Sequence, residues 1–494
     1  MTPQRLRKTR EGSGRRPIAA ALAVVVMVAA CASTHGLKPQ AALAGEDNLA
    51  AAQSLGSAAI DSSSWPQQNW WSRFDDPQLD QLMSEALAGS PSLKVALARA
   101  RQAAAVAEAA DSVRSPRVDS SLSATRERFP ANGVIPPPFA GGWSTFDQLQ
   151  ATLSWDIDFW GKNRAAFEQA LGQARAAAVD QQAARLALSV DVAHAYVQLM
   201  RAYLQLDVGQ ATVEQRQTVY ALTRDRNAAG LDSRLELKQA EAAVPAAREQ
   251  VEQLNETIAL TRNQLAALLG QGPDRGLAIK RPAAMAGADA ALPSRVPSQL
   301  LGRRPDIVAQ RWRVEAASRG IHVAQAQFYP DVNLTAFVGF QSLGTSGFLS
   351  LGNREVGVGP ALSLPLFDAG QRRANLAAAD AQYDAAVEQY NQTLVDALRE
   401  VVDQLTSFRS LSEQRNEQQQ ALAASRDAYD LAVLRYREGV GNYLQVLSAE
   451  APLLTQEALE VDLRARALDL SINLVRALGG GVEPASPPLA SVAP

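Results

Sequence analysis

The sequence predicts a mostly helical fold with a small β part, built from two copies of one unit. The first observation behind this prediction is an internal repeat, which constrains the architecture before any motif is considered. Sliding the second half back by 209 positions aligns Gly161 with Gly370, Arg226 with Arg435, Gly230 with Gly439, Leu235 with Leu444 and Gly270 with Gly479. The other two observations are long proline-free stretches of helix formers and short segments in which apolar and polar residues alternate.

Upstream of these matches the two copies align at a different offset. It becomes 214 positions and pairs Pro91 with Pro305, Arg99 with Arg313 and Pro116 with Pro330. The difference falls between residues 118 and 153, in a segment rich in proline and glycine. Each copy therefore reads as helix, strand, variable loop, strand, very long helix, tight turn and long helix. We assign the copies to residues 65–270 and 303–479, with a linker at 271–302.

The chain begins with a targeting segment, which does not belong to the fold. Six basic residues precede an apolar run from Ile18 to Ala30, and this run is too short to span a bilayer as a helix. Small residues then precede Cys31, the only cysteine in the sequence. The pattern resembles a bacterial lipobox and predicts a signal peptide at 1–30 and acylation of Cys31. Because Ala32 follows instead of aspartate, the resemblance favours delivery to the outer membrane.

Charge and composition narrow the possible partners. Removing residues 1–30 takes away six basic residues and one acid, so the formal net charge changes from −3 to −8. An acidic chain is poorly suited to bind nucleic acid. The segment at 31–64 is rich in alanine and serine and is expected to be a flexible, lipid-anchored tether. The glycine- and proline-rich segment at 480–494 is expected to be a disordered tail.

Two pairs of long helices are predicted, one pair in each copy. Residues 162–227 contain no proline and consist mainly of alanine, glutamine, arginine and leucine, which form helices readily. About 65 residues at 1.5 Å each give a rod of roughly 100 Å. A second helix returns after a tight turn, so the helical hairpins are expected at about 162–269 and 371–478. Small residues in their heptad seams allow the helices to approach closely.

Two β-hairpins are predicted at about 118–159 and 332–366. Leu149, Leu153 and Trp155 alternate with polar residues in the first hairpin, and Val332 and Leu334 do so in the second. Alternation over about ten residues is typical of transmembrane β-barrel strands. Four strands cannot close a barrel, and open strand edges cannot lie in hydrocarbon. Several copies of the chain must therefore contribute strands to one shared barrel.

Several motifs of this chain resemble those of the TolC/OprM-like outer-membrane factors of tripartite efflux systems, the NodT-type lipoproteins. They are WWSRFDDPQL at 70–79, SPSL at 90–93, RRPDI at 303–307 and FYP at 328–330. The resemblance covers about residues 65–480. It implies a TolC-like homotrimer with a twelve-stranded barrel in the outer membrane and a long helical tunnel in the periplasm. It also implies a periplasmic adaptor and an inner-membrane transporter of the resistance-nodulation-division class as partners.

The resemblance further places the two helical turns at the periplasmic tip, where the adaptor docks. The tip residues that match the family are Arg226, Gly230, Asp232, Ser233, Arg435, Gly439 and Asn442. The expected channel gate comprises Tyr436, Leu444, Gln445 and Ser448. Many family members carry acidic residues at the positions of Gln445 and Ser448, so a cation-binding ring of carboxylates is not expected here. Arg226 and Arg435 also have a purely structural interpretation, because a basic residue in the last turn complements the helix dipole.

No pattern in the sequence supports an enzyme, a cofactor or a metal site. The three histidines, His35, His194 and His322, lack metal-ligand spacing, and nucleophile and phosphate-binding motifs are missing from the sequence. We therefore expect a passive outer-membrane exit duct of an efflux pump. The alternatives are a conduit for type I protein secretion and, in a different class, a lipid-anchored coiled-coil adaptor or scaffold.

Overall fold

The computed structural model describes residues 36–44, 66–283, 285, 302–344 and 346–481. The predicted signal peptide, Cys31, most of the tether and almost all of the tail lie outside these residues. The chain is mostly helical (68%) with one small sheet. It divides into two compact units, and each unit takes stretches from both sequence copies. The sheet unit falls within residues 1–43, 101–175 and 311–389, and the hairpin unit within 44–100, 176–310 and 390–494.

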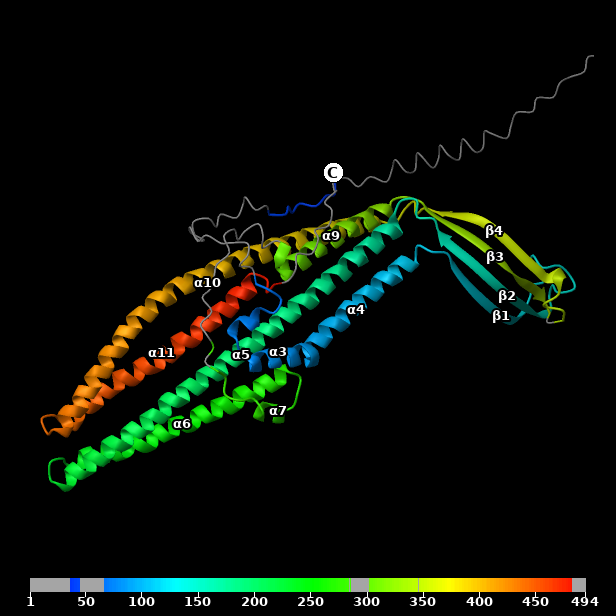
Figure 1. Ribbon diagram of the computed structural model, residues 1–494. Helices are drawn as coiled ribbons and strands as arrows, with labels where there is room; N and C mark the ends of the chain where they lie inside the picture. Colours follow the sequence, from blue (N-terminus) through cyan, green and yellow to red (C-terminus); the bar gives the residue numbers. More distant parts are fainter. Residues whose placement is uncertain (1–35, 45–65, 284, 286–301, 345, 482–494) are drawn as a thin grey trace, which may run out of the picture. The chain divides into compact units, whose positions relative to one another are not determined.

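The sheet unit contains four antiparallel strands in the order β1-β2-β3-β4 (Figure 1). Their bounds are β1 Arg117–Arg128, β2 Trp143–Asp156, β3 Asp331–Leu343 and β4 Arg354–Ser363. The register places Leu122 opposite Leu149 and Leu149 opposite Phe340. β1 pairs with β2 and β3 pairs with β4 as two hairpins, and the second hairpin pairs with the first through β2 and β3. As a result, β1 and β4 are the edges of the sheet.

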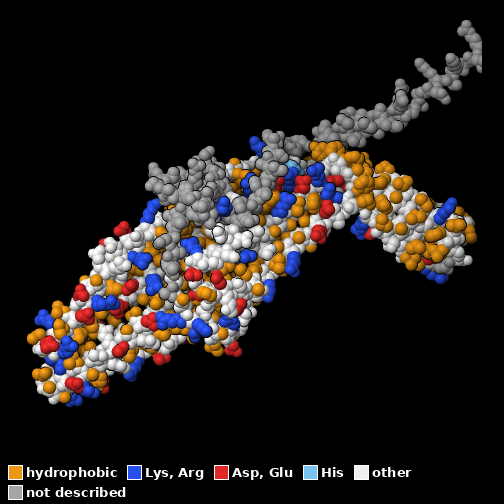
Figure 2. Space-filling view, viewed as in Figure 1, with side chains coloured by type: hydrophobic (Ala, Val, Ile, Leu, Met, Phe, Trp, Pro, Cys, Tyr) orange, Lys and Arg blue, Asp and Glu red, His pale blue; other side chains and the backbone are white. Residues whose placement is uncertain are grey.

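Large apolar side chains of the strands are exposed in this single chain. Val118 and Leu122 of β1 are 66% and 72% exposed, and Val356 and Val358 of β4 are 72% and 77% exposed. Figure 2 shows apolar side chains predominating over the sheet, whereas acidic and basic side chains are scattered over the helices. Exposed apolar surface of this extent indicates a face that contacts lipid or another chain.

Two strands, β2 and β4, end earlier than the alternation of apolar and polar residues predicts. The pattern continues to Phe159, yet β2 ends at Asp156, because the backbone of Asp158 adopts a left-handed conformation (φ 46°). The Asp158 carboxylate then accepts hydrogen bonds from the backbone N–H groups of Asn163 (3.0 Å) and Arg164 (2.8 Å). It thereby satisfies donors that are unpaired at a helix start. After β4, the Asp368 carboxylate likewise accepts hydrogen bonds from the backbone N–H groups of Gly370 and Arg372.

The helices reproduce the repeat residue for residue. α4 Pro91–Ser112 and α9 Pro305–Ala326 have 22 residues each. α5 Lys162–Ala228 and α10 Gln371–Arg437 have 67 each, and α6 Arg234–Leu268 and α11 Tyr443–Ala477 have 35 each. α6 returns beside α5, and α11 returns beside α10 (Figure 1). Among the described helices, none is both long and apolar enough to cross a bilayer.

The core of the hairpin unit surrounds the middle of α5. Tyr196 and Leu199 are fully buried there, together with Leu265 of α6 and Ile472 of α11. The short helices η3 Trp70–Phe74, α3 Pro77–Gly89 and α7 Asp274–Leu277 complete the elements of this part of the chain. The Asp76 carboxylate accepts from two backbone N–H groups of α3 and from the Tyr196 hydroxyl (2.8 Å), which fixes α3 against α5.

Candidate functional site

The two tight turns that join the long helices resemble each other in backbone geometry. Gly230, after α5, and Gly439, after α10, have φ values of +75° and +81°. L-residues with a side chain rarely adopt this region, so glycine is favoured at both points. The N–H groups of Leu231 and Val440 donate to the carbonyls of Arg226 and Arg435, respectively. Each turn therefore closes on the last turn of its own helix.

The returning helices begin with side-chain caps. Ser233 and Glu236 form a reciprocal capping box at the start of α6. At the start of α11, the Asn442 side chain accepts a hydrogen bond from the Gln445 backbone N–H (3.1 Å). Ser233 and Asn442, two of the predicted tip residues, thus define where the helices restart. Glu236 is used in its own helix cap.

One predicted tip arginine holds the two hairpins together. Arg226 of α5 donates from Nε to Asp232 (3.0 Å) and from Nη1 to the backbone carbonyl of Tyr436 in α10 (2.9 Å). The Tyr436 hydroxyl donates to Asp232 and lies 3.0 Å from Thr223 Oγ1. We call these four residues, Arg226, Asp232, Tyr436 and Thr223, the tip network. It connects the end of the first hairpin with the end of α10.

The tip network is shielded from water within the single chain. Tyr436 is 0% exposed, and the Arg226 and Asp232 side chains are 12% and 8% exposed. Burial raises the pKa of Tyr436 to about 12, and the bond to Asp232 raises it as well. The hydrogen bond that Arg226 donates to Asp232 also raises the pKa of Arg226. The network therefore holds a neutral tyrosine beside a charged guanidinium across the neutral pH range.

The second copy cannot form the same network, for a reason visible in the repeat. At an offset of 209, the counterpart of Asp232 is Gly441, and the counterpart of Tyr436 is Asn227. Arg435 has no acid at the equivalent place, and its carbonyl accepts from the N–H groups of Val440 and Gly441. The copies therefore diverge at the tip, where one acid and one tyrosine are supplied by different copies.

Three of the predicted gate residues lie outside the tip network. Leu444 is 67% exposed, and the Ser448 hydroxyl donates to the Leu444 carbonyl within α11. Gln445 lies beside them and lines the same groove between α10 and α11, with a volume of about 680 Å³. The groove wall consists mostly of small side chains: Ala424, Ser425, Ala428, Ala449 and Ser448. Tyr436, the fourth gate residue, is in the network and faces the interior of the chain.

The acids near the tips are engaged within the chain. Glu450 of α11 is buried and pairs with Arg216 of α5 at 3.0 Å, an interaction that the sequence pattern did not reveal. Glu241 pairs with Lys238 at 2.6 Å on the exposed face of α6. Within the described part of the chain, no group of three or more His, Cys, Asp or Glu side chains is arranged to hold a metal ion.

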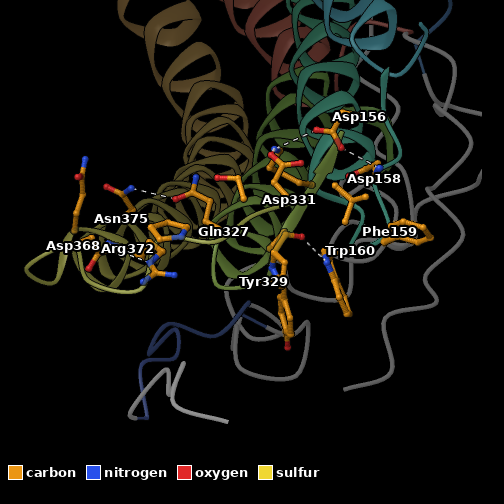
Figure 3. A pocket seen from close by; sticks show the side chains of 17 residues that line it. Asp156, Asp158, Phe159, Trp160, Gln327, Tyr329, Asp331, Asp368, Arg372 and Asn375 are labelled. Carbon is orange, nitrogen blue, oxygen red and sulfur yellow. Dashed lines mark hydrogen bonds and ion pairs between the residues drawn. The ribbon is translucent and has the colours of Figure 1, made fainter. Parts of the chain in front are cut away.

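A second pocket lies in the sheet unit, where the strands meet the helices (Figure 3). It has a volume of about 420 Å³. The rings of Trp160 and Tyr329 stack with centroids 4.7 Å apart, and Trp160 Nε1 donates to the Pro330 carbonyl (2.9 Å). Lys162 pairs with Asp331 at 2.7 Å, and burial, which lowers its pKa, is outweighed by this pairing. With its cation paired and its rings stacked, this pocket fixes the strand–helix junction.

Comparisons with known proteins agree with this fold and geometry. The outer membrane efflux protein family matches residues 82–271 and 296–480. The fusaric acid resistance protein FusA of Burkholderia cepacia is 42% identical over 365 residues, covering 73% of this chain and 69% of that protein. The multidrug resistance outer membrane protein MdtP of Escherichia coli is 32% identical over 432 residues, covering 86% of this chain and 88% of that protein.

Solved structures show the same architecture. The outer membrane protein VceC of Vibrio cholerae matches with a TM-score of 0.80 at 40% identity, over 85% of this chain and 100% of that one. The outer-membrane channel OprN matches with a TM-score of 0.80 at 31% identity, over 91% of this chain and 99% of that one. The predicted TolC-like fold class is therefore confirmed.

Proposed function

The chain belongs to the outer membrane efflux protein family and is an outer-membrane efflux channel, and we propose that it forms the exit duct as a homotrimer. The edge strands β1 and β4 carry this proposal. Each presents unpaired backbone groups and exposed apolar side chains, and such edges are not stable in hydrocarbon. Three chains pairing β4 of one with β1 of the next would close about twelve strands.

We also propose that the tip groove receives a periplasmic adaptor, which couples the duct to an inner-membrane transporter of the resistance-nodulation-division class. The groove between α10 and α11 is open and lined by small side chains beside the exposed Leu444. Such a surface admits a helix or a helical turn at close range, as small residues do in helix pairs. Gly439 and Asn442, at the adjoining turn, belong to the same docking surface.

The tip network supports a closed resting state of the duct. Outward movement of the α5–α6 turn from α10 would break the bonds from Arg226 and from the Tyr436 hydroxyl at the same time. We propose that the gate opens when the α5–α6 turn and α10 separate in this way. Leu444, Gln445 and Ser448 lie on the exposed surface of α11, beside the point of separation. Adaptor docking in the neighbouring groove is then the event that shifts the balance toward the open state.

The proposed cargo is small toxic molecules, and the proposed attachment is a lipid on Cys31. FusA is named for fusaric acid resistance and MdtP for multidrug resistance, and these names favour small-molecule export over type I protein secretion. The pattern before Cys31 supports cleavage and acylation at that residue. The family membership rules out the coiled-coil scaffold as the main function.

Three measurements test these proposals. Light scattering of the detergent-solubilised protein should give the mass of three chains, and a monodisperse monomer with an intact β-sheet signal would contradict the trimer. Labelled palmitate should be incorporated into the native protein and not into the Cys31→Ser variant. Loss of the gene should raise the accumulation of toxic organic compounds in the cells. Loss of a secreted protein, with accumulation unchanged, would instead support the secretion alternative.

A further inference from the structure

A short segment at the amino-terminal end of the described chain lies along α10. The backbone N–H groups of Gln40 and Ala41 both donate to Asp384 Oδ1, each at 2.9 Å. The N–H of Ala44 donates to Asn391 Oδ1 at 2.8 Å. Leu37 packs against a buried cluster that includes Phe328 and Leu376. We call residues 36–44 the strap.

The strap is extended, and it runs in the same direction as α10. Leu37, Pro39 and Ala41 are half-buried, while Lys38 and Gln40 are exposed, which is the period-two pattern of an extended chain on a surface. Four extended residues from Leu37 to Ala41 span about 13 Å. The helix rises about 12 Å over the eight residues from Leu376 to Asp384. The two lengths agree, so the amino-terminal end of the strap lies toward the start of α10, which follows β4.

The contact depends on side chains of α10 and on the backbone of the strap. Asp384 and Asn391 are seven residues apart, which is two helical turns, and they therefore lie on one face of the helix. Hydrogen bonds from N–H groups to a charged carboxylate are stronger than those between neutral groups. Asp384 makes two such bonds with the same oxygen. Of the three hydrogen bonds given above for the strap, Asp384 accepts two and Asn391 accepts one.

We propose that Asp384 is a positioning residue, which clamps the strap on α10 and thereby holds the acylated Cys31 at the sheet end of that helix. The proposal rests on the lipid attachment proposed above. Cys31 precedes Gly36 by five positions in the sequence, and a chain of that length reaches at most about 17 Å. The clamp thus limits how far the lipid can lie from the strands and keeps the attachment point at the membrane end of the chain.

Hydrogen–deuterium exchange on the full chain in detergent tests the clamp. Peptides containing residues 40 and 41 should exchange slowly in the native protein and at least tenfold faster in Asp384→Ala, because both N–H groups lose a charged acceptor. Asp384→Asn keeps a side-chain oxygen as acceptor and should restore most of the protection. Asp403→Ala is the matched control, because Asp403 is an exposed acid of the same helix that pairs with Arg399. Unchanged exchange in Asp384→Ala, or equal acceleration in Asp403→Ala, would overturn the clamp.

A second experiment tests the direction of the strap in a chain that carries no acyl group. The Cys31→Ser chain has no cysteine, so a dye can be attached at Lys38→Cys or at Leu43→Cys, two exposed positions. In vesicles containing spin-labelled lipids, the dye at position 38 should be quenched at least twofold more than the dye at position 43. Asp384→Ala should abolish this difference. Equal quenching at the two positions, or stronger quenching at 43, would overturn the proposal.

The two proposals fail in different ways. If the native protein carries no acyl group by mass spectrometry, the lipid attachment is wrong, while the quenching difference in the Cys31→Ser chain still reports the strap. If the acyl group is present and the quenching difference is missing, the strap proposal is wrong and the lipid attachment stands.

Discussion

Arg226 lies over the ring of Tyr436, with its guanidinium carbon 4.5 Å from the ring centroid, and donates to the carbonyl of the same residue at 2.9 Å. The two residues belong to different sequence copies, so this pair joins the end of α5 to the end of α10. A cation over an aromatic ring adds to the hydrogen bond and to the ion pair with Asp232. The ends of α5 and α10 are therefore joined by several contacts, all of which would break if the two ends separated.

Replacing the acid of the tip network should open the channel. Asp232→Ala leaves Arg226 without its carboxylate and the Tyr436 hydroxyl without its charged acceptor. We expect a loss of about 2 kcal/mol at the tip, because a buried guanidinium and a buried hydroxyl are left without their shared acceptor. Single-channel conductance in planar bilayers should rise several-fold. Asp225→Ala is the matched control, because Asp225 is an exposed acid one residue before Arg226 that pairs with Arg224. Equal conductance of native protein and Asp232→Ala would contradict the gating role.

Removing one hydroxyl should give a smaller effect with a characteristic pH dependence. Tyr436→Phe loses the bond to Asp232 but keeps the ring under Arg226, so its conductance should fall between those of native protein and Asp232→Ala. The pKa of Tyr436 is raised to about 12, above the ordinary value of about 10. The stabilisation that the Tyr436 hydroxyl gives to the folded tip is therefore complete below pH 10 and is lost as the pH rises through 12.

Ultraviolet titration of tyrosinate measures that pH dependence directly. The difference between native protein and Tyr436→Phe should show one tyrosine that ionises near pH 12. Tyr443, whose pKa burial also raises to about 12, is present in both proteins and cancels in the difference. A difference curve centred at pH 10 would show that Tyr436 is accessible to water, contrary to its burial.

The sequence was sufficient for the long helices because their determinants are local and repeated. The two copies align at an offset of 209 positions, and α10 and α11 begin and end 209 residues after α5 and α6. The strand ends were less predictable, because the apolar alternation through Phe159 competes with the capping carboxylate of Asp158. The tip residues were predicted from their resemblance to the family's tip motifs, but their pairing across the copies depends on tertiary contacts.

The contact between the strap and Asp384 could not be predicted from the sequence either. Asp384 is one acid among many on a solvated helix, and nothing in its local pattern distinguishes it from Asp396 or Asp403. Its role depends on a segment 343 residues away in the sequence. Contacts over such distances leave no periodic signal in one sequence, whereas a heptad or an alternating strand does.

A buried acid beside Asp384 allows a test of how ionisation affects the stability of the chain. Asp380, one turn before Asp384, is 6% exposed, and neither of its carboxylate oxygens has a hydrogen-bond partner. Burial raises the pKa of Asp380, and repulsion from Asp384 adds to this effect. A raised pKa in the folded state means that ionisation opposes folding, so this acid destabilises the chain at neutral pH. Asp380→Asn should increase the free energy of unfolding by about 1 kcal/mol.

The pH profile separates this mechanism from simple repacking. The gain from Asp380→Asn should shrink as the pH falls through the raised pKa of the carboxyl, because the native acid is then neutral. Thermal unfolding of both proteins at neutral and acidic pH measures it, with Asp403→Asn as the exposed control. A gain that does not depend on pH would show that ionisation of Asp380 is not the cause.

The gate should bind divalent and trivalent cations weakly. Hard cations bind through carboxylate oxygens, and the positions that carry acids in many relatives are Gln445 and Ser448 here. The structure also accounts for the acids that might replace them. Glu236 caps α6, Glu241 pairs with Lys238, and Glu450 is buried against Arg216. None of the three is left as an unpaired carboxylate near the tip.

Single-channel conductance with cation added from the tip side tests this expectation. The native channel should be blocked only weakly, and Gln445→Asp/Ser448→Asp should be blocked at cation concentrations at least tenfold lower, because three chains would then present six additional carboxylates. Gln445→Asn/Ser448→Asn is the matched neutral control, and its block should equal that of the native channel. Strong block of the native channel, equal to that of the acidic variant, would mean that an acid elsewhere leaves its partner to line the pore. Glu450 would be the first candidate, since it lies two residues after Ser448 and is held by its pairing with Arg216 of α5. An added Glu450→Gln change would then remove the block.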